Sequence, residues 1–336
     1  MLTEDKKNMR KTDYKNPVKG ILPFVSQGIR NALERVDIKI LESAEEIRLR
    51  ADKPLIIQQY LKEWFVSKNG GLGEFCSEPY LVDQSELSKT IEIMSENSIY
   101  AYQDEIKNGF ITLKGGHRVG IAGKVVLDGN SIKNIKNISG INIRISREVP
   151  GCSDHVINYV LNGKGGVYNT LIISPPQCGK TTILRDLSRK ISDGISESGF
   201  RGMKVGIVDE RSEIAACYKG VPQNNVGMRT DVMDGCPKSL GMCMMIRSMS
   251  PQVIITDEIG GQGDKESIMS VINAGVKIIA TAHGYNLTEL KSRREVIGLM
   301  EEKVFERFIV LNNSKGPGTL AEVIDGLTYN VLYKGG

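Results

Sequence analysis

The segment 174–182 has the residue types of a phosphate-binding loop. It reads Ser-Pro-Pro-Gln-Cys-Gly-Lys-Thr-Thr and follows the apolar run 170–174. The P-loop pattern is Gly-x-x-x-x-Gly-Lys-Ser/Thr, and Ser174 stands where its first glycine would be. A loop that leads from a strand into a helix directs several backbone N–H groups at one point, where the helix dipole adds positive potential. The sequence therefore predicts a site for nucleotide phosphates.

Three residues of this loop have distinct expected roles. Gly179 lets the backbone close around a phosphate, Lys180 places its charge on the β and γ oxygens, and Thr181 offers a hydroxyl to Mg²⁺. A helix N-terminus with an incidental lysine is the competing interpretation. The apolar strand that precedes the loop and the helix pattern that follows it favour the nucleotide site. The expected contact set is the whole loop: Ser174, Pro175, Pro176, Gln177, Cys178, Gly179, Lys180, Thr181 and Thr182.

Acidic residues end two further apolar runs. Asp257 and Glu258 follow the run 253–256, as the Mg²⁺-organising acid of a P-loop protein would. Asp257 is expected to hold the hydration shell of the metal, and Glu258 to orient or deprotonate the attacking water. A second acidic end contains Asp209 and Glu210, for which a plain surface turn is the alternative.

His283 ends a fourth apolar run, and its strand is expected beside the phosphate strand, so that the imidazole can sense the γ-phosphate. A hydrogen-bonded packing residue is the alternative role. An arginine that reaches the transferred phosphoryl group can raise the rate by roughly 10³–10⁵. The candidates are Arg118, Arg144 and Arg147 in the first half of the chain, and Arg229, Arg247 and Arg307 in the second.

Four β-branched runs must position these residues: 170–174, 203–210, 251–258 and 277–284. Each is followed by a helix-like pattern. Continuous apolar strands that alternate with helices are typical of a parallel sheet covered on both faces. Such sheets bind ligands outside the carboxyl ends of their strands, which is where the acids, the histidine and the loop occur.

The first half, 21–150, has a mixed pattern that predicts an α+β domain. Helices are expected over 24–36, after Asp83 with Glu86 completing a capping box, and over 98–107. Alternation indicates a strand around 47–50. Glycines separate further short strands of an antiparallel sheet, at 110–116, 118–129 and 141–149.

Composition excludes several classes of protein. The 336 residues are 40% hydrophobic, and no run of 18 apolar residues predicts a membrane span. Six cysteines without a Cys-x-x-Cys pair argue against a structural zinc site and fit a reducing cytoplasm. A net charge of +4 is too small to indicate nucleic-acid binding. Residues 1–20 are expected to form a flexible arm, either untethered or directed at an acidic membrane surface.

The four strand ends, in this order, resemble the P-loop, Asp box, Walker B and His box of type II and type IV secretion ATPases. The chain is more closely similar to the stage III sporulation protein AA family of endospore-forming bacteria. The similarity covers roughly residues 40–330 and is carried by the segments 109–125, 141–151, 175–186, 205–216, 226–260 and 278–284.

The resemblance implies a role for each matching residue. Lys180 and Thr181 would serve phosphate and Mg²⁺, Glu210 the Asp box, Glu258 the Walker B acid and His283 the His box. Secretion ATPases bring arginines of the N-terminal domain to the nucleotide, which implies Arg118 and Arg144. They generally carry Gly-Glu where this chain has Asp257-Glu258, which leaves open which acid serves the metal.

The expected fold class is α/β, with a RecA-like P-loop NTPase core at 151–336 behind the smaller α+β domain at 21–150. The resemblance implies Mg²⁺-dependent ATP hydrolysis in a homo-oligomeric ring, taken as a hexamer, that powers a channel complex of sporulation membrane proteins. Its place would be the mother-cell cytoplasm, peripheral at the membrane facing the forespore. A RecA-like nucleic-acid motor, a nucleotide-gated scaffold with little turnover and a small-molecule kinase are the alternatives.

Overall fold

The computed structural model describes residues 18–59, 62–96, 102, 105–106, 109–129, 131–261, 263–291 and 293–335. The chain divides into two compact units, Met1–Arg147 and Glu148–Gly336. The sequence placed this boundary after residue 150. Of the expected arm 1–20, the first 17 residues lie outside the described residues, as does most of the expected helix 98–107. Val18 is buried in the core of the first unit.

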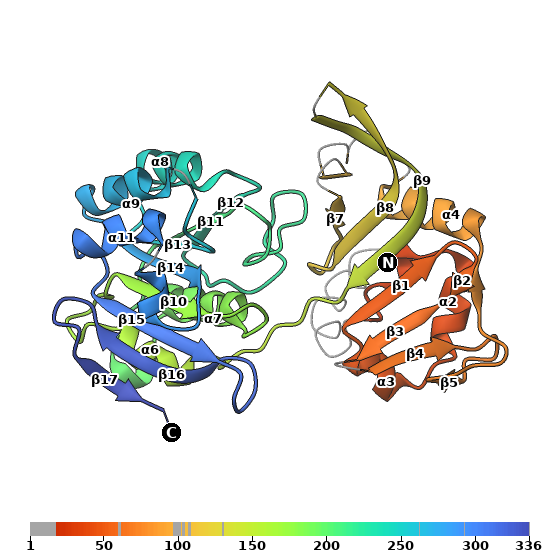
Figure 1. Ribbon diagram of the computed structural model, residues 1–336, viewed down its shortest axis with the longest axis horizontal. Helices are drawn as coiled ribbons and strands as arrows, with labels where there is room; N and C mark the ends of the chain where they lie inside the picture. Colours follow the sequence, from red (N-terminus) through yellow and green to blue (C-terminus); the bar gives the residue numbers. More distant parts are fainter. Residues whose placement is uncertain are drawn as a thin grey trace, which may run out of the picture. The chain divides into compact units, whose positions relative to one another are not determined.

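The N-terminal unit is built on a seven-stranded sheet of order β5-β4-β3-β1-β9-β8-β7 (Figure 1). Every pairing described in this sheet is antiparallel, as the sequence predicted. The strands are β1 (Glu46–Arg50), β3 (Ile56–Gln59), β4 (Lys62–Val66), β5 (Leu72–Gly73), β7 (Phe110–Thr112), β8 (Arg118–Asp128) and β9 (Ser131–Arg144). A separate pair is formed by β2 (Lys53–Pro54) and β6 (Leu81–Val82).

The helices of this unit are η2 (Leu22–Phe24), α2 (Gln27–Glu34), α3 (Ile38–Ser43) and α4 (Gln84–Met94). The helix expected over 24–36 is shorter than predicted, because Ser26 caps α2 by accepting a hydrogen bond from the backbone of Ile29. The capping box before α4 is confirmed: Asp83 accepts from the backbone of Ser85, and Glu86 accepts from the backbone of Asp83.

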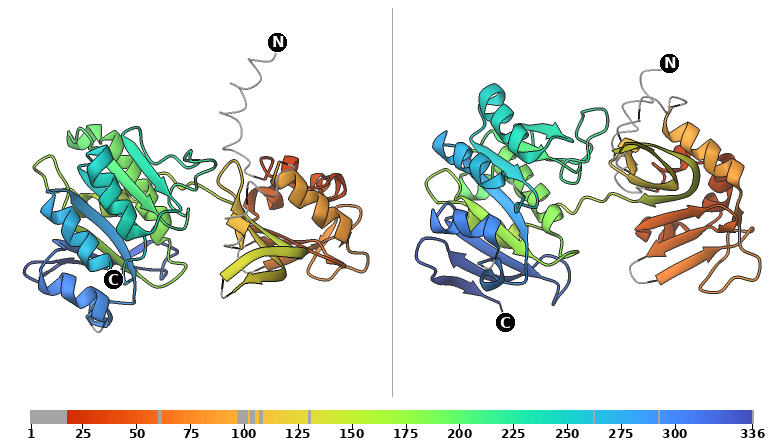
Figure 2. Two further views of the ribbon diagram at one scale, coloured as in Figure 1. Left: turned by 90° about the horizontal axis from the view of Figure 1, so that it is seen from above. Right: turned by 45° about the horizontal axis from the view of Figure 1, so that its top comes forward.

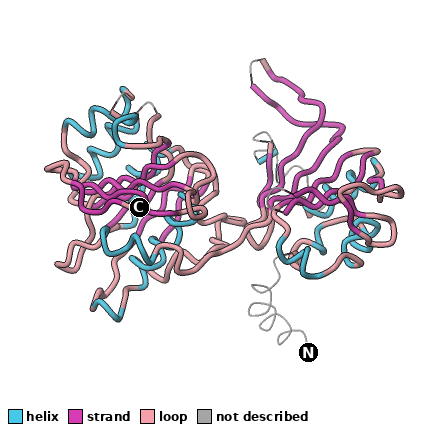
Figure 3. Tube along the Cα trace, turned by 60° about the horizontal axis from the view of Figure 1, so that its bottom comes forward, coloured by secondary structure: helices cyan, strands magenta, loops and turns pink. Residues whose placement is uncertain are grey.

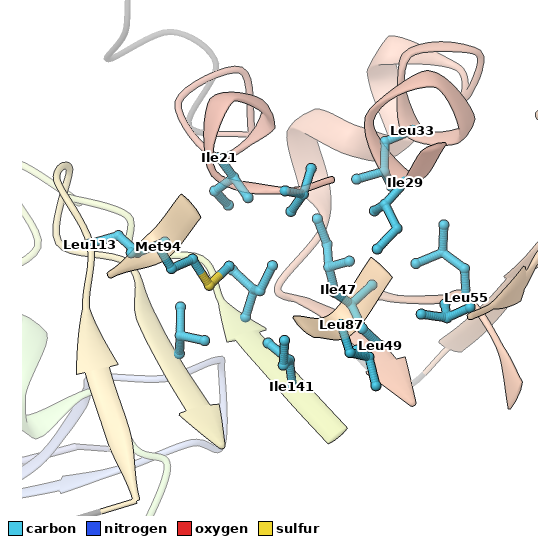
Figure 4. Packing of buried hydrophobic residues seen from close by; sticks show 14 of the residues in the cluster. Ile21, Ile29, Leu33, Ile47, Leu49, Leu55, Leu87, Met94, Leu113 and Ile141 are labelled. Carbon is cyan, nitrogen blue, oxygen red and sulfur yellow. The ribbon is translucent and has the colours of Figure 1, made fainter. Parts of the chain in front are cut away.

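Aliphatic side chains from the helices and the sheet form the core of the N-terminal unit. Figure 4 shows Ile29 and Leu33 of α2 and Leu87 of α4 gathered over Ile47 and Leu49 of β1. Ile47 and Leu49 are fully buried while their neighbours in β1 are not, so the alternating pattern has one face in the core.

His117 is a buried histidine whose charge state couples to the stability of this unit. Only 3% of it is exposed, and its Nδ1 accepts a hydrogen bond from the backbone N–H of Ser146 at 3.2 Å. Burial lowers its pKa from 6.5 to about 4. Below pH 6.5 the unfolded chain therefore takes up a proton that the folded unit does not, and the free energy of unfolding falls as the pH drops towards 4.

We expect a loss of up to about 3 kcal/mol between pH 7 and pH 4 from this group. The measurement is urea unfolding across that pH range, followed by the fluorescence of Trp64. This residue is the only tryptophan of the chain and lies in β4 of the same unit. His117→Gln should flatten this component of the pH dependence. An unchanged pH profile in that variant would contradict the prediction.

The C-terminal unit is built on an eight-stranded sheet of order β12-β11-β13-β14-β10-β15-β16-β17. The pairings from β12 to β15 are parallel, and β16 and β17 add antiparallel strands at one edge. The strands are β10 (Thr170–Ser174), β11 (Val205–Asp209), β12 (Thr230–Asp234), β13 (Val253–Thr256), β14 (Lys277–His283), β15 (Arg307–Asn312), β16 (Thr319–Asp325) and β17 (Val331–Lys334).

Helices cover both faces of this sheet, as Figures 2 and 3 show. Ile172 packs in one core with α6 (Asp154–Val160) and α7 (Lys180–Asp193). Leu171 and Ile173 pack in a second core on the opposite face. The helices that contribute to the second core are α8 (Lys238–Met249), α9 (Asp264–Asn273), α10 (Leu287–Leu290) and α11 (Arg294–Glu301), and a short η4 (Ser196–Ser198) follows α7. The parallel sheet covered on both faces is confirmed.

The parallel register brings the predicted strand ends to one edge of the sheet. Ser174 at the end of β10 pairs with His283 at the end of β14. Thr256, the last residue of β13, pairs with Ala280 of β14 and with Val208 of β11. The residues that follow these strands therefore start from neighbouring positions.

Candidate active site

The loop between β10 and α7 makes its left-handed turns at Gln177 (φ 60°) and Gly179 (φ 76°), and α7 begins at Lys180. Ser174 is not left-handed: it is the last residue of β10, and its hydroxyl donates to the carbonyl of Pro175 at 3.0 Å. The backbone here thus does not require the glycine of the P-loop pattern at position 174. The left-handed backbone at 179 favours glycine, because a side chain there would be strained.

Lys180 is 7% exposed, and its ammonium group lies inside the loop. Its Nζ donates to the carbonyls of Ser174 at 3.1 Å and Pro175 at 3.4 Å, and lies 2.8 Å from Nδ1 of His283. Burial lowers the pKa of this amine, and the charge of Asp257 works in the opposite direction. A buried amine whose partners are neutral acceptors is suited to exchange them for phosphate oxygens.

Asp257 connects the end of β13 to the first turn of α7. Thr181 donates its hydroxyl to Oδ2 of Asp257 at 2.7 Å, and Oδ1 accepts from the hydroxyl of Thr281 and from the backbone N–H of Glu258 at 3.0 Å. The hydroxyl and carboxylate oxygens expected to serve a metal therefore lie together.

This oxygen pair fits magnesium chemically. Mg²⁺ prefers oxygen ligands, and it commonly keeps several waters and takes one or two protein carboxylates together with substrate phosphates. Within the described ranges, no group of three or more His, Cys, Asp or Glu side chains could hold a metal ion. A magnesium ion beside Thr181 and Asp257 would thus draw most of its ligands from water and phosphate.

Glu258 is held from two sides. Its Oε1 lies 2.7 Å from Nε2 of His283, and its Oε2 accepts from Nη1 of Arg211 at 2.8 Å. The ammonium of Lys180 can only donate, so Nδ1 of His283 is the acceptor and Nε2 carries the hydrogen that Glu258 accepts. The result is a continuous chain of hydrogen bonds from Lys180 through His283 and Glu258 to Arg211.

The acidic end of β11 holds its own loop. Asp209 is 2% exposed and accepts hydrogen bonds from the three backbone N–H groups of residues 213–215. Burial raises its pKa to about 6, against the effect of those hydrogen bonds. Asp209 therefore fixes the conformation of the loop that follows β11.

Glu210, expected as the Asp-box acid, forms an ion pair with Lys238 at 2.5 Å. It lines a small cavity of about 10 Å³ together with Asp257 and Glu258, and with Arg211. The structure thus brings the two acidic strand ends to the same cavity. Glu210 lines the wall of this cavity, and the carboxylate of Glu210 is paired with Lys238.

Arg118 and Arg144 belong to the N-terminal unit, where they stand opposite each other in register on β8 and β9. Nε of Arg144 lies 3.3 Å from Oε1 of Glu46, and the guanidinium of Arg118 lies 3.7 Å from the centre of the Phe110 ring. A role for Arg118 and Arg144 in nucleotide chemistry therefore stays a prediction.

Three of the other four candidate arginines bond to groups within their own units. Arg147 donates to three carbonyls at the end of α3, and Arg229 donates to two carbonyls at the end of α7. Arg307 forms an ion pair with Asp325 at 2.7 Å. Arg247 is exposed in the last turn of α8. Three of the four thus hold secondary structure in place.

Two contributors to the site were not predicted. Arg211 follows the acidic pair of β11 and bonds to Glu258, and Thr281 lies within β14 and bonds to Asp257 and to the backbone of Glu258. Thr281 could have been found, because a hydroxyl in an otherwise apolar buried strand needs a partner. Nothing in the local sequence points Arg211 at Glu258.

Comparison with known proteins identifies relatives over most of the chain. A family model described as sporulation stage III, protein AA, matches residues 15–330. Stage III sporulation protein AA of Bacillus subtilis (strain 168) is 39% identical over 310 residues, which are 92% of this chain and 95% of that protein. In the described part of this chain, no helix is both long enough and apolar enough to cross a membrane.

Two solved structures share the fold. The Legionella pneumophila ATPase DotB superposes with a TM-score of 0.53 at 14% identity, over 84% of this chain and 77% of its own. The pilus retraction motor PilT, solved with bound ADP, gives a TM-score of 0.52 at 12% identity, over 84% and 76%. The predicted fold class is confirmed: a RecA-like P-loop core behind a smaller α+β domain.

Proposed function

The chain belongs to the sporulation stage III protein AA family, and from that membership and the geometry at residues 174–182 we propose that it is a Mg²⁺-dependent ATPase of the secretion-motor type. One observation carries this proposal. The amine of Lys180 and the carboxylate of Glu258 contact the same imidazole, that of His283, while Thr181 and Asp257 lie together beside them.

Each residue of this arrangement has a role in the proposed hydrolysis. Lys180 leaves its carbonyl partners and binds the β and γ phosphate oxygens, which accumulate charge as the bond to the leaving oxygen breaks. Thr181 and Asp257 would hold Mg²⁺, which when bound neutralises charge on the same phosphates. Glu258 orients the water that attacks the γ-phosphorus and accepts its proton. Once Lys180 turns to phosphate, Nδ1 of His283 loses its donor.

In this proposal, His283 connects the lysine that binds the nucleotide to the water-orienting acid Glu258. Its two ring nitrogens contact Lys180 and Glu258, so a change of partner at one nitrogen alters the hydrogen bond at the other. Glu210 lines the same cavity as the water-orienting acid and would act as the Asp-box carboxylate. Arg118 and Arg144 complete the set as the arginines of the N-terminal domain.

The proposal extends to assembly and place. The chain would work as a homo-oligomeric ring, taken as a hexamer, and drive a channel complex of sporulation membrane proteins. It would act in the mother cell, peripheral at the membrane facing the forespore. Hydrolysis would be coupled to domain movement, for which the two compact units of this chain supply the parts.

The test is phosphate release by the purified chain with ATP and magnesium, with the mass in solution measured by light scattering with and without ATP. We expect release that stops when EDTA removes magnesium, and a ring-sized mass with ATP. Release that requires added DNA would favour the nucleic-acid motor. A ring that forms on ATP without any release would favour the nucleotide-gated scaffold.

A further inference from the structure

Apart from the acidic cavity at Glu210, a groove lies in the C-terminal unit, beside the loop that joins β15 to β16. Its volume is about 690 Å³ and it is open to solvent. Pockets that enclose small molecules are typically about 300–1,000 Å³, so a nucleoside has ample room here. Its walls include His155 and Tyr159 of α6, Lys315 and Pro317 of the loop, and Tyr333 of β17.

The loop that forms this groove also packs on the phosphate loop. A Cβ atom on Gly179 would lie 3.4 Å from the backbone nitrogen of Gly318 and 3.6 Å from Pro317. On the other side, the carbonyl of Gly318 bonds to Nε2 of His155 at 2.8 Å. The residues 316–318 therefore separate the phosphate loop from the groove by the thickness of one backbone segment. A ligand held at Gly179 reaches the groove by crossing them.

The groove presents aromatic surface. The rings of Tyr159 and Tyr333 lie 6.0 Å apart, inclined by 49°, and Tyr333 is 37% exposed. Aromatic side chains stack on the flat faces of nucleobases, and each such contact is worth about 1–3 kcal/mol by alanine substitution. Two tyrosines in a groove next to a phosphate loop thus suit the base of a nucleotide.

We propose that this groove binds the nucleobase of the nucleotide whose phosphates are held by residues 179–182, with the base stacked on Tyr159 or Tyr333. This assignment rests on the proposed function. It also names the part of the fold that holds the base. The base contacts residues of α6 and β17, which are not part of the P-loop, Walker B or His-box segments.

The polar groups of the loop also bear on base selectivity. Oδ1 of Asn312 accepts from Ser314, and the hydroxyl of Thr319 donates to the carbonyl of Gly316. These oxygens are bonded within the loop, so we expect stacking on the face of the base to contribute more to binding than hydrogen bonds to its edge. Sites that hydrogen-bond a substrate's polar groups discriminate strongly, whereas stacking does not. ATP and GTP are therefore expected to bind within about 10-fold of each other.

The test compares two probes that share phosphates but not a base: ATP and inorganic tripolyphosphate, each titrated by calorimetry into the full chain with magnesium. Wild-type protein should bind ATP more tightly than tripolyphosphate. The alanine variant of the stacking ring, Tyr159→Ala or Tyr333→Ala, should weaken ATP about 5- to 100-fold and leave tripolyphosphate unchanged. Tyr333→Phe keeps the ring and should keep the affinity. Phe75→Ala, which removes a 95% exposed ring of the N-terminal unit, is the matched control.

Distinct results would overturn the groove and the phosphate site. A wild-type chain that binds both probes with equal affinity contradicts the groove alone, whether or not the alanine variants fold. Folded Tyr159→Ala and Tyr333→Ala proteins that both bind ATP as tightly as wild type contradict it as well. A wild-type chain that binds neither probe refutes the phosphate loop, and this assignment with it.

Discussion

Lys180→Ala is expected to abolish detectable ATP binding and hydrolysis. The amine is buried inside the loop and donates only to groups that a phosphate oxygen would replace. Hydrogen bonds between a charged donor and phosphate are about twice as strong as neutral ones, and none remains from this position after truncation. We expect the dissociation constant for ATP to rise at least about 100-fold, measured by calorimetry with magnesium.

The control for this variant is Lys164→Ala, which removes an exposed lysine of the same unit. It should bind ATP like the wild type. Circular dichroism should show that Lys180→Ala is folded, since the residue contributes no apolar surface to either core. A folded Lys180→Ala protein with unchanged ATP affinity would place the nucleotide elsewhere.

Glu258→Gln should separate binding from chemistry. The amide keeps the size of the side chain and an oxygen for Arg211, but it cannot accept the proton of the attacking water. General base catalysis typically contributes about 10²–10⁴ in rate, so phosphate release should fall by that factor while the dissociation constant for ATP changes only a few-fold. Steady-state release and calorimetry on the same preparation measure both quantities.

Glu266→Gln, an exposed glutamate in the first turn of α9, is the matched control and should turn over normally. Full turnover in Glu258→Gln would remove this residue from the role of base. Asp257, which bonds to Thr181 and Thr281, would then be the acid to test next.

The sequence predicted the C-terminal unit well because its signals are long and redundant. Strands such as 170–174 and 277–283 are buried on both faces, so they appear as unbroken apolar runs that few other structures would use. Parallel pairing then brings their ends together without further information. The approach of Thr181 to Asp257, 76 positions apart, follows from this geometry alone.

Local competition and long-range contacts account for what the sequence did not reveal. The helix expected over 24–36 was too long because a serine cap at Ser26 outweighs the apolar spacing that continues before it. The bond between Arg211 and Glu258 joins two loops that start from different strands, and no periodicity encodes it. At Ser174 a family pattern suggested a glycine, but the backbone turns three residues later, at Gln177.

The most direct test is a single-turnover experiment with enzyme in excess over γ-labelled ATP and magnesium. Wild-type protein should convert its bound ATP to ADP and labelled phosphate, while Glu258→Gln retains intact ATP over the same period. Conversion at equal rates by both proteins, or bound ATP that the wild type leaves intact, would contradict a hydrolytic site built from Lys180 and Glu258.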